Sequence, residues 1–293
     1  MDWSKLTYEQ FHTKFSSEDA CIDFLIQLKW PKGFRCPRCD HRHAYITSTR
    51  RLPLYECSHC CHQVSLLSGT IMEGSRTRLS KWLLAIFLIS STPSGTTAMK
   101  LSQLIQVTYK TAWLILHKIR TSIHLADNQR PLTGSVQINS AIYGRPFNPS
   151  VHKHPQEHLL LVGSSLDHSG VTPTTTVKIK QVTPSSPTNK HITRFDTINF
   201  QQQHINPNAD KIEIVTGFFT SKRQRPLLEI AKQASTWINS TFHGIGSKHL
   251  QSYLDEFCYR INLTASSVPI FDHLVQLCMN IPKAIPKPLC QAA

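Results

Sequence analysis

The stretch that decides the fold of the first part of the chain runs from Arg35 to Ser68 and reads RCPRCDHRHAYITSTRRLPLYECSHCCHQVSLLS. It holds two Cys-x-x-Cys pairs separated by seventeen residues, and the four cysteines are Cys36, Cys39, Cys57 and Cys60. Four thiolates at this spacing form the ligand set of one tetrahedral structural zinc ion. The stretch therefore predicts a zinc site.

Residues of strand composition lie between and after the two cysteine pairs, at 44–48, 52–57 and 63–69. Such strands can pair while each Cys-x-x-Cys forms a turn, which predicts a small β zinc ribbon. Cys61 falls outside the ligand register, and we interpret it as a free thiol. The alternative nitrogen ligands are His41, His43, His59 and His62, but four cysteines already complete a tetrahedron. The isolated cysteines are expected in the core or on the surface: Cys21, Cys258, Cys278 and Cys290.

Positive charge is concentrated in one part of this 293-residue chain, whose formal net charge is +14. Residues 24–126 contain fourteen Lys and Arg against three acids, and residues 74–126 contain no acid. Such asymmetry suits a polyanion, because neutralised phosphates release counterions. The sequence thus predicts double-stranded DNA as a partner; a basic face that serves solubility alone is the alternative.

Composition argues against a secreted or membrane protein. The amino terminus lacks a signal-peptide pattern, and the longest apolar run, Trp82–Ile89, is far below the roughly 20 residues that span a bilayer. We expect a reducing cytoplasmic location, with nucleoid association when the protein is bound to DNA, and no membrane partner. A reducing compartment favours metal binding over disulfides for the paired cysteines.

Helical periodicity follows the ribbon. Apolar residues predict helices from Ser80 to about residue 92, over 96–105 and over 109–120, the last capped by Thr108. Two short helices joined by a tight turn match a helix-turn-helix, whose second helix meets base edges at its amino end. We therefore expect Tyr109, Lys110 and Thr111 at the major groove, and Lys118 and Arg120 near phosphates. Trp113, Leu116 and Ile119 are predicted core residues.

A change of composition after a predicted linker at 127–133 indicates a further domain. Strands are expected over 136–144, 158–167, 174–182 and 211–219, and helices over 226–242 and 249–262. The predicted divisions are 1–72, the ribbon with amino-terminal helices; 73–126, the helix-turn-helix segment; 133–270, an α/β domain; and 271–293, a carboxy-terminal helix and irregular tail. The fold class is multidomain.

Several motifs resemble those of insertion-sequence transposases with an amino-terminal zinc ribbon. They are KWPKGFRCPRC, the second cysteine pair, LLSGTIMEGSRTRLSKWLLAIFLI, YKTAWLILHKIR and STFHGIGSKHLQSYLDEFCYRIN. The resemblance implies an RNase H-like catalytic domain, recognition of inverted-repeat DNA ends, and strand cleavage and transfer by carboxylates that hold two magnesium ions. Two such cations need several anionic oxygen ligands.

The family's carboxylate positions fall on other residue types in this chain. They match Asn139, Gly217 and Leu228. Asparagine offers one neutral carbonyl oxygen in place of a carboxylate, so affinity for a metal pair should fall steeply. Asp255 and Glu256 belong to a family motif that we interpret as structural.

Three hypotheses follow. The favoured one is a DNA-binding transposase-family protein with structural Zn²⁺ and a decayed catalytic site, for which a homo-oligomer on DNA is a candidate assembly. The first alternative is an active Mg²⁺-dependent transposase. The second is a zinc-ribbon adaptor that engages protein partners.

Overall fold

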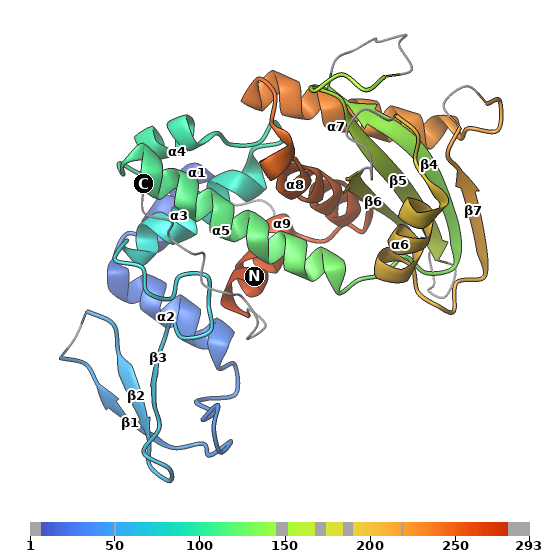
Figure 1. Ribbon diagram of the computed structural model, residues 1–293. Coiled ribbons are helices and arrows are strands. Elements are labelled where there is room, and N and C mark those ends of the chain that lie inside the picture. The colour runs from blue at the N-terminus through green and yellow to red at the C-terminus, as the bar shows by residue number, and fades with distance from the viewer. Residues whose placement is uncertain are drawn as a thin grey trace. The chain divides into compact units, whose positions relative to one another are not determined.

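The computed structural model describes residues 7–49, 51–144, 152–167, 174–183, 190–217 and 220–280. The chain divides into two compact units. The first unit contains residues 1–91, 98–122 and 271–293, and the second contains residues 92–97 and 123–270. Figure 1 labels the elements of both.

The first unit begins with two capped helices, α1 (Tyr8–Lys14) and α2 (Glu18–Lys29). The side chain of Thr7 accepts a hydrogen bond from the backbone of Gln10, whose side chain accepts one from the backbone of Thr7. Ser17 caps α2 by accepting from the backbone of Ala20. These side chains accept hydrogen bonds from backbone N–H groups that have no partner within the first helical turn. The capping residues therefore determine where both helices begin.

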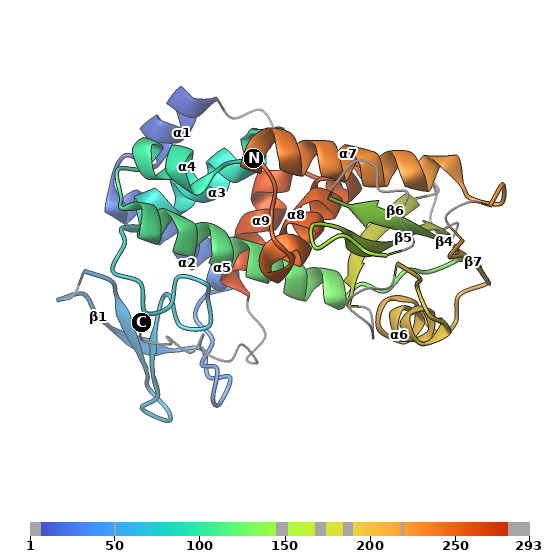
Figure 2. The ribbon, with the colours of Figure 1, turned by 45° about the horizontal axis from the view of Figure 1, so that its top comes forward.

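A three-stranded antiparallel sheet follows, drawn in blue at the lower left of Figure 2. Its strands are β1 (Ala44–Thr47), β2 (Leu54–Cys57) and β3 (Gln63–Ser65), in the order β1-β2-β3. The register places Ala44 opposite Cys57, so the end of β2 leads directly into the second cysteine pair. The sheet agrees with the ribbon strands predicted from composition.

Helices complete the first unit: α3 (Leu79–Ser91), α4 (Ala98–Leu104), most of α5 (Tyr109–Asn128) and α9 (Ile270–Met279). The ring of Phe87 on α3 stacks on Phe11 at 4.6 Å between centroids and meets Phe271 of α9 edge-on at 6.1 Å. The backbone N–H of Ile71 also donates to the carbonyl of Cys278. Helix α9 is therefore part of the same core as the amino-terminal helices, although we predicted residues 271–293 as a separate segment.

The second unit is built on a four-stranded sheet in the order β6-β5-β4-β7. The strands are β4 (Ser135–Tyr143), β5 (His158–Asp167), β6 (Thr174–Val182) and β7 (Lys211–Val215). The first three pair antiparallel in sequence order, and β7 then pairs parallel to β4. Helix α6 (Arg194–His204) connects β6 to β7.

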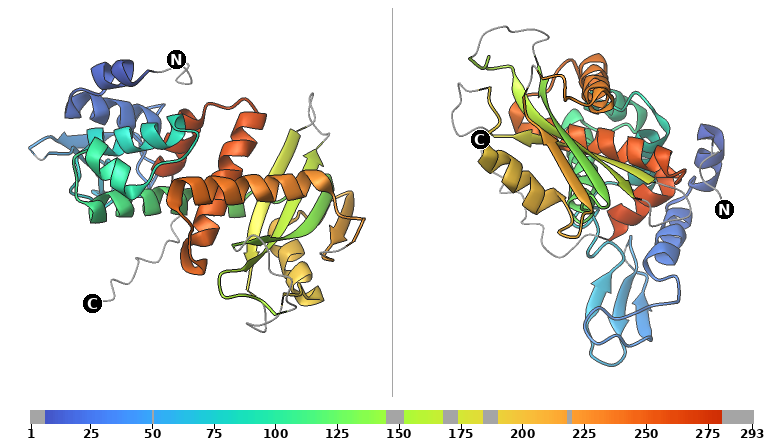
Figure 3. Two further views of the ribbon diagram at one scale, coloured as in Figure 1. Left: turned by 90° about the horizontal axis from the view of Figure 1, so that it is seen from above. Right: turned by 90° about the vertical axis from the view of Figure 1, so that its right-hand side faces the viewer.

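Helices cover both faces of this sheet, as the right-hand view of Figure 3 shows. Val136, Ile138 and Leu161 pack with Phe200 of α6 on one face. Tyr143, Leu160, Val162 and Ile179 pack on the other face against α7 (Arg225–Phe242) and α8 (Ser247–Ala265). Alternate residues of each strand face opposite sides, which explains why strands covered on both faces are apolar at successive positions.

Side chains of α8 close the outer edge of β6. The amide of Asn262 accepts from the backbone N–H of Val177 and donates to the carbonyl of the same residue. Gln251 accepts from the N–H of Gln181 and donates to the carbonyl of Ile179. These bonds replace those of a neighbouring strand and protect an edge that would otherwise be open to pairing.

The structure corrects two details of the sequence analysis. Helix α5 continues to Asn128 and so includes the start of the predicted linker. Asp127 forms ion pairs with Lys178 and Lys180 of β6. Trp113 is 36% exposed and stacks on His117, whereas Leu116 and Ile119 are buried as predicted. Trp113 lies about 100° around the helix from the buried Ala112, at the flank of the apolar stripe.

Candidate zinc centre and nucleic-acid interface

The four predicted ligands of the zinc ribbon converge. The Sγ atoms of Cys36 and Cys60 and those of Cys39 and Cys57 are each 3.6 Å apart, and Cys39 and Cys60 are 3.3 Å apart. Zn–S bonds of about 2.3 Å in a tetrahedron separate the sulfur atoms by about 3.8 Å. These residues fit a structural zinc ion with no open coordination position.

The two Cys-x-x-Cys turns have equivalent backbone geometry. Cys36 donates its N–H to the carbonyl of His41, and Cys57 donates to that of His62, at 2.9 and 3.0 Å. The residue after each pair is left-handed, with φ of 58° at Asp40 and 54° at Cys61. Cys61 is exposed and outside the four-sulfur group, which agrees with its interpretation as a free thiol.

Backbone amides favour the thiolate form of the ligand Cys57. Burial raises the pKa of Cys57, but N–H donors from Cys60 and His59 and the neighbouring sulfurs outweigh it and lower the pKa to about 6. Deprotonated sulfur is the form that binds zinc, so the turn prepares this ligand for the metal. Within the described residues, no other group of three or more His, Cys, Asp or Glu side chains is gathered closely enough to hold a metal ion.

Lys29 is the last residue of α2, and its side chain binds the segment that follows β3 of the ribbon. This residue was not identified from the sequence. Its Nζ atom donates to the carbonyl oxygens of Ser65, Leu66 and Ser68, at 3.1, 2.7 and 2.7 Å. Burial lowers the pKa of Lys29 to about 8. All three N–H donors of the ammonium group are therefore used on the segment that follows β3.

The residues predicted to meet base edges lie at the first turn of α5. Tyr109 is 55% exposed, Lys110 is exposed, and Thr111 is half-buried. The hydroxyl of Thr108 accepts from the backbone N–H of Thr111, which confirms the predicted cap. The short break between α4 and α5 contains Gln106, whose φ of 51° turns the chain sharply.

The two residues predicted to contact phosphates are less exposed than Tyr109 and Lys110. Lys118 is half-buried and donates to the carbonyl of Ile71 at 2.8 Å. Arg120 is only 5% exposed. A phosphate contact needs a guanidinium at the surface, and Arg120 is buried together with Leu116 and Ile119 of the same helix. We therefore leave Arg120 out of the proposed interface.

The three positions that match the family's catalytic residues meet at one edge of the second unit. Asn139 is fully buried, and its Nδ2 donates to the carbonyl of Gln224, which also accepts from the backbone N–H of Leu228. The neighbouring Ser140 donates from its hydroxyl to the carbonyl of Thr216, next to Gly217. Segments far apart in sequence are thus brought together at Asn139 and Ser140.

An arginine that the sequence analysis missed lies at the same place. Arg223 donates from Nη2 to the carbonyl of Ser140 at 2.6 Å, and burial lowers its pKa. The Oδ1 atom of Asn139 is buried and has no hydrogen-bond partner among the described residues. The side chain of Asn139 thus contacts the carbonyl of Gln224, and a cationic side chain contacts the next residue, Ser140.

Comparisons with known proteins agree with the zinc centre. Residues 16–63 match the family model of the transposase zinc-ribbon domain. The chain is also 30% identical, over 127 residues, to an uncharacterized protein in transposable element ISH50 of Halobacterium salinarum. The aligned part covers 43% of this chain and 42% of that relative. No solved structure is significantly similar to the chain.

The amino-terminal part of the chain is therefore a zinc ribbon of the transposase type. Beyond the ribbon, the chain is similar to part of a protein of a transposable element, and the aligned region spans less than half of either chain. Within the ranges that the structure describes, none of the helices is both long and apolar enough to cross a lipid bilayer.

Proposed function

We propose that this protein binds double-stranded DNA as a member of the transposase family, recognises the inverted-repeat ends of an element, and has lost catalytic metal binding. The observation that carries the DNA-binding part is the exposed amino end of α5 in a segment without acids. Tyr109 and Lys110 are exposed there, and residues 74–126 hold seven Lys and Arg. Helices α4 and α5 with their tight turn fit a helix-turn-helix.

An RNase H-like fold is our proposal for the second unit. Three antiparallel strands in sequence order, a connecting helix, and a strand parallel to the first support it. The meeting of Asn139 with the segments around Gly217 and Leu228 supports the alignment of catalytic positions.

The loss of metal binding is inferred from the chemistry of this edge. The amide of Asn139 donates to the carbonyl of Gln224, a bond that a carboxylate could not make because it has no N–H. A carboxylate at this position would instead face carbonyl oxygens. The Arg223 guanidinium contributes a positive charge beside the position, where a metal pair would need negative ligands. The local contacts thus suit asparagine.

Binding of the zinc-loaded chain to duplex DNA, followed by fluorescence anisotropy over a range of salt concentrations, tests this function. We expect a steep salt dependence, as several phosphate contacts produce. Replacing both Tyr109 and Lys110 by Ala should weaken binding roughly 10- to 100-fold. The substitution Lys232→Ala, an exposed cation on α7, is the control and should have little effect. Salt-independent or absent binding by the wild-type chain would refute the proposal.

A further inference from the structure

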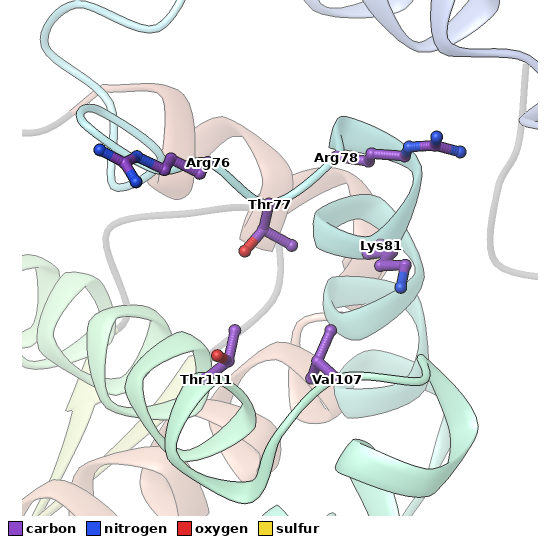
Figure 4. A pocket seen from close by; sticks show the side chains of 6 residues that line it. All are labelled: Arg76, Thr77, Arg78, Lys81, Val107 and Thr111. Atoms are coloured by element: carbon purple, nitrogen blue, oxygen red, sulfur yellow. The ribbon is translucent and has the colours of Figure 1, made fainter.

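An open pocket of about 460 Å³ lies beside the amino end of α5 in the first unit (Figure 4). Its walls come from two stretches of the chain. The segment before α3 and its first turn supply Arg76, Thr77, Arg78 and Lys81, and the turn before α5 with the first turn of that helix supplies Val107 and Thr111.

The lining is basic. Arg76 and Arg78 are exposed, and within the described part of the chain neither forms an ion pair. Two acids near this segment are engaged elsewhere. Glu73, the nearest acid in the sequence, accepts from the backbone N–H of Gly69, and Glu18, which accepts from the backbone N–H of Leu79, pairs with Arg51. Both arginines therefore retain their full capacity to bind an anion.

Lys81 fixes one wall of the pocket. Its Nζ donates to the carbonyl of Gln106 at 2.8 Å, which ties α3 to the turn before α5. This bond uses one of the three donors of the ammonium group and leaves its charge in place. The position of the pocket relative to Tyr109 and Lys110 is thus set by a direct contact.

The arrangement of the side chains suits a sugar-phosphate segment. Thr77 and Thr111 point toward each other across the hollow, and the side chains of Arg76 and Arg78 extend outward from its rim in opposite directions (Figure 4). The two hydroxyls and the apolar Val107 in the hollow suit a deoxyribose, and the guanidinium groups at the rim suit phosphates of a backbone that passes over it.

We propose that this pocket and its rim bind the backbone of duplex DNA, with one phosphate at Arg76 and another at Arg78, and so fix the register of α5 on the duplex. This inference rests on the proposed function and adds the residues that anchor it. Phosphate contacts of this kind position a protein without reading sequence.

Salt-dependent binding of duplex DNA by the full zinc-loaded chain tests the pocket. The double substitution Arg76→Ala with Arg78→Ala should flatten the slope of log K against log salt by about 1.8, since each phosphate contact contributes about 0.9. The matched control is Lys232→Ala with Lys248→Ala, which removes two exposed cations from α7 and α8 and should leave the slope unchanged. Circular dichroism verifies folding of both variants.

A charge-preserving variant, Arg76→Lys with Arg78→Lys, should recover most of the slope, because each lysine still neutralises one phosphate. Equal slopes for the pocket and control variants would overturn the inference while leaving DNA binding itself intact. Absence of salt-dependent binding by the wild-type chain would overturn the proposed function and the pocket together.

Discussion

The ammonium group of Lys180 lies 2.8 Å from a carboxylate oxygen of Asp255, and the two side chains are only 7% and 1% exposed. Asp127 lies 2.6 Å from Lys180 and 2.8 Å from Lys178, and His124 lies 2.6 Å from Asp255. The network joins the carboxy-terminal end of α5 to β6 and α8. Burial raises the pKa of Asp255, but His124 and Lys180 outweigh it, so its pKa is lowered.

Removing the charge of Asp255 should therefore destabilise the second unit. The substitution Asp255→Asn leaves the buried Lys180 with Asp127 as its remaining carboxylate partner. Breaking a buried ion pair costs about 3–5 kcal/mol, and we expect a loss near the lower end of this range. Urea unfolding followed by circular dichroism measures the change, with Asp210→Asn at an exposed position as the control. A loss within about 0.5 kcal/mol of the control would show that the network adds little.

Stability should also fall with acidification below pH 6.5, because of His204. Burial and the nearby Lys180 and Lys178 lower the pKa of His204 to about 4, although Asp127 and Asp255 act in the opposite direction. Between pH 6.5 and about 4 the unfolded chain binds a proton at this residue and the folded chain does not. The free energy of unfolding therefore decreases toward acid, by at most about 1.4 kcal/mol per pH unit.

The variant His204→Gln should show a shallower pH dependence in this interval, measured as urea midpoints from pH 7 to pH 4.5. The same change at the exposed His12 serves as the control. Identical pH profiles for His204→Gln and the wild-type chain would contradict the assignment. The carboxylate of Asp255 contributes to pH dependence only at lower pH, since its lowered pKa keeps it charged in this interval.

Zinc should be bound at the four-sulfur site. We expect Cys57→Ser to abolish zinc binding in elemental analysis and to disorder the ribbon, because metal binding and folding are coupled in such domains. Cys61→Ser should keep its zinc, since Cys61 lies outside the ligand group. Equal zinc content in the two variants would rule out this ligand assignment.

Lys29 should contribute to the attachment of the ribbon to α2. The substitution Lys29→Met removes three hydrogen bonds to backbone carbonyls. Bonds from a charged donor are worth about 1.5–3 kcal/mol, and the remaining carbonyls lose a partner, so we expect a loss of about 2–3 kcal/mol. Lys32→Met, at an exposed position, is the control in the same thermal unfolding experiment. Matching transitions for the two variants would exclude this role.

Local features of the fold were predictable from the sequence because local signals determine them. The Cys-x-x-Cys spacing predicted the zinc ligands, and alternating or continuous apolar runs predicted β4, β5 and β6 nearly residue by residue. The apolar pattern over 249–262 likewise predicted a helix, and in α8 the residues Leu250, Leu254 and Cys258 of this pattern are almost fully buried.

Long-range features were not predictable in this way. Phe271 of α9 packs against Phe11 and Phe87, and no local pattern in the sequence indicates this contact. Asp127 looked like a linker residue because its partners, Lys178 and Lys180, are about fifty residues away. Arg120 resembled a phosphate contact by charge, but its place on the apolar side of α5 buries it.

The central claim is that the protein binds DNA but no longer cuts it, and one measurement tests this most directly. The zinc-loaded chain is incubated with a duplex that carries the DNA flanking its own coding region, in Mg²⁺, and the strands are separated on a denaturing gel. We predict that the preparation binds the duplex and yields no cleavage or strand-transfer product above a protein-free control. Mg²⁺-dependent cleavage that Asn139→Ala abolishes would contradict the account.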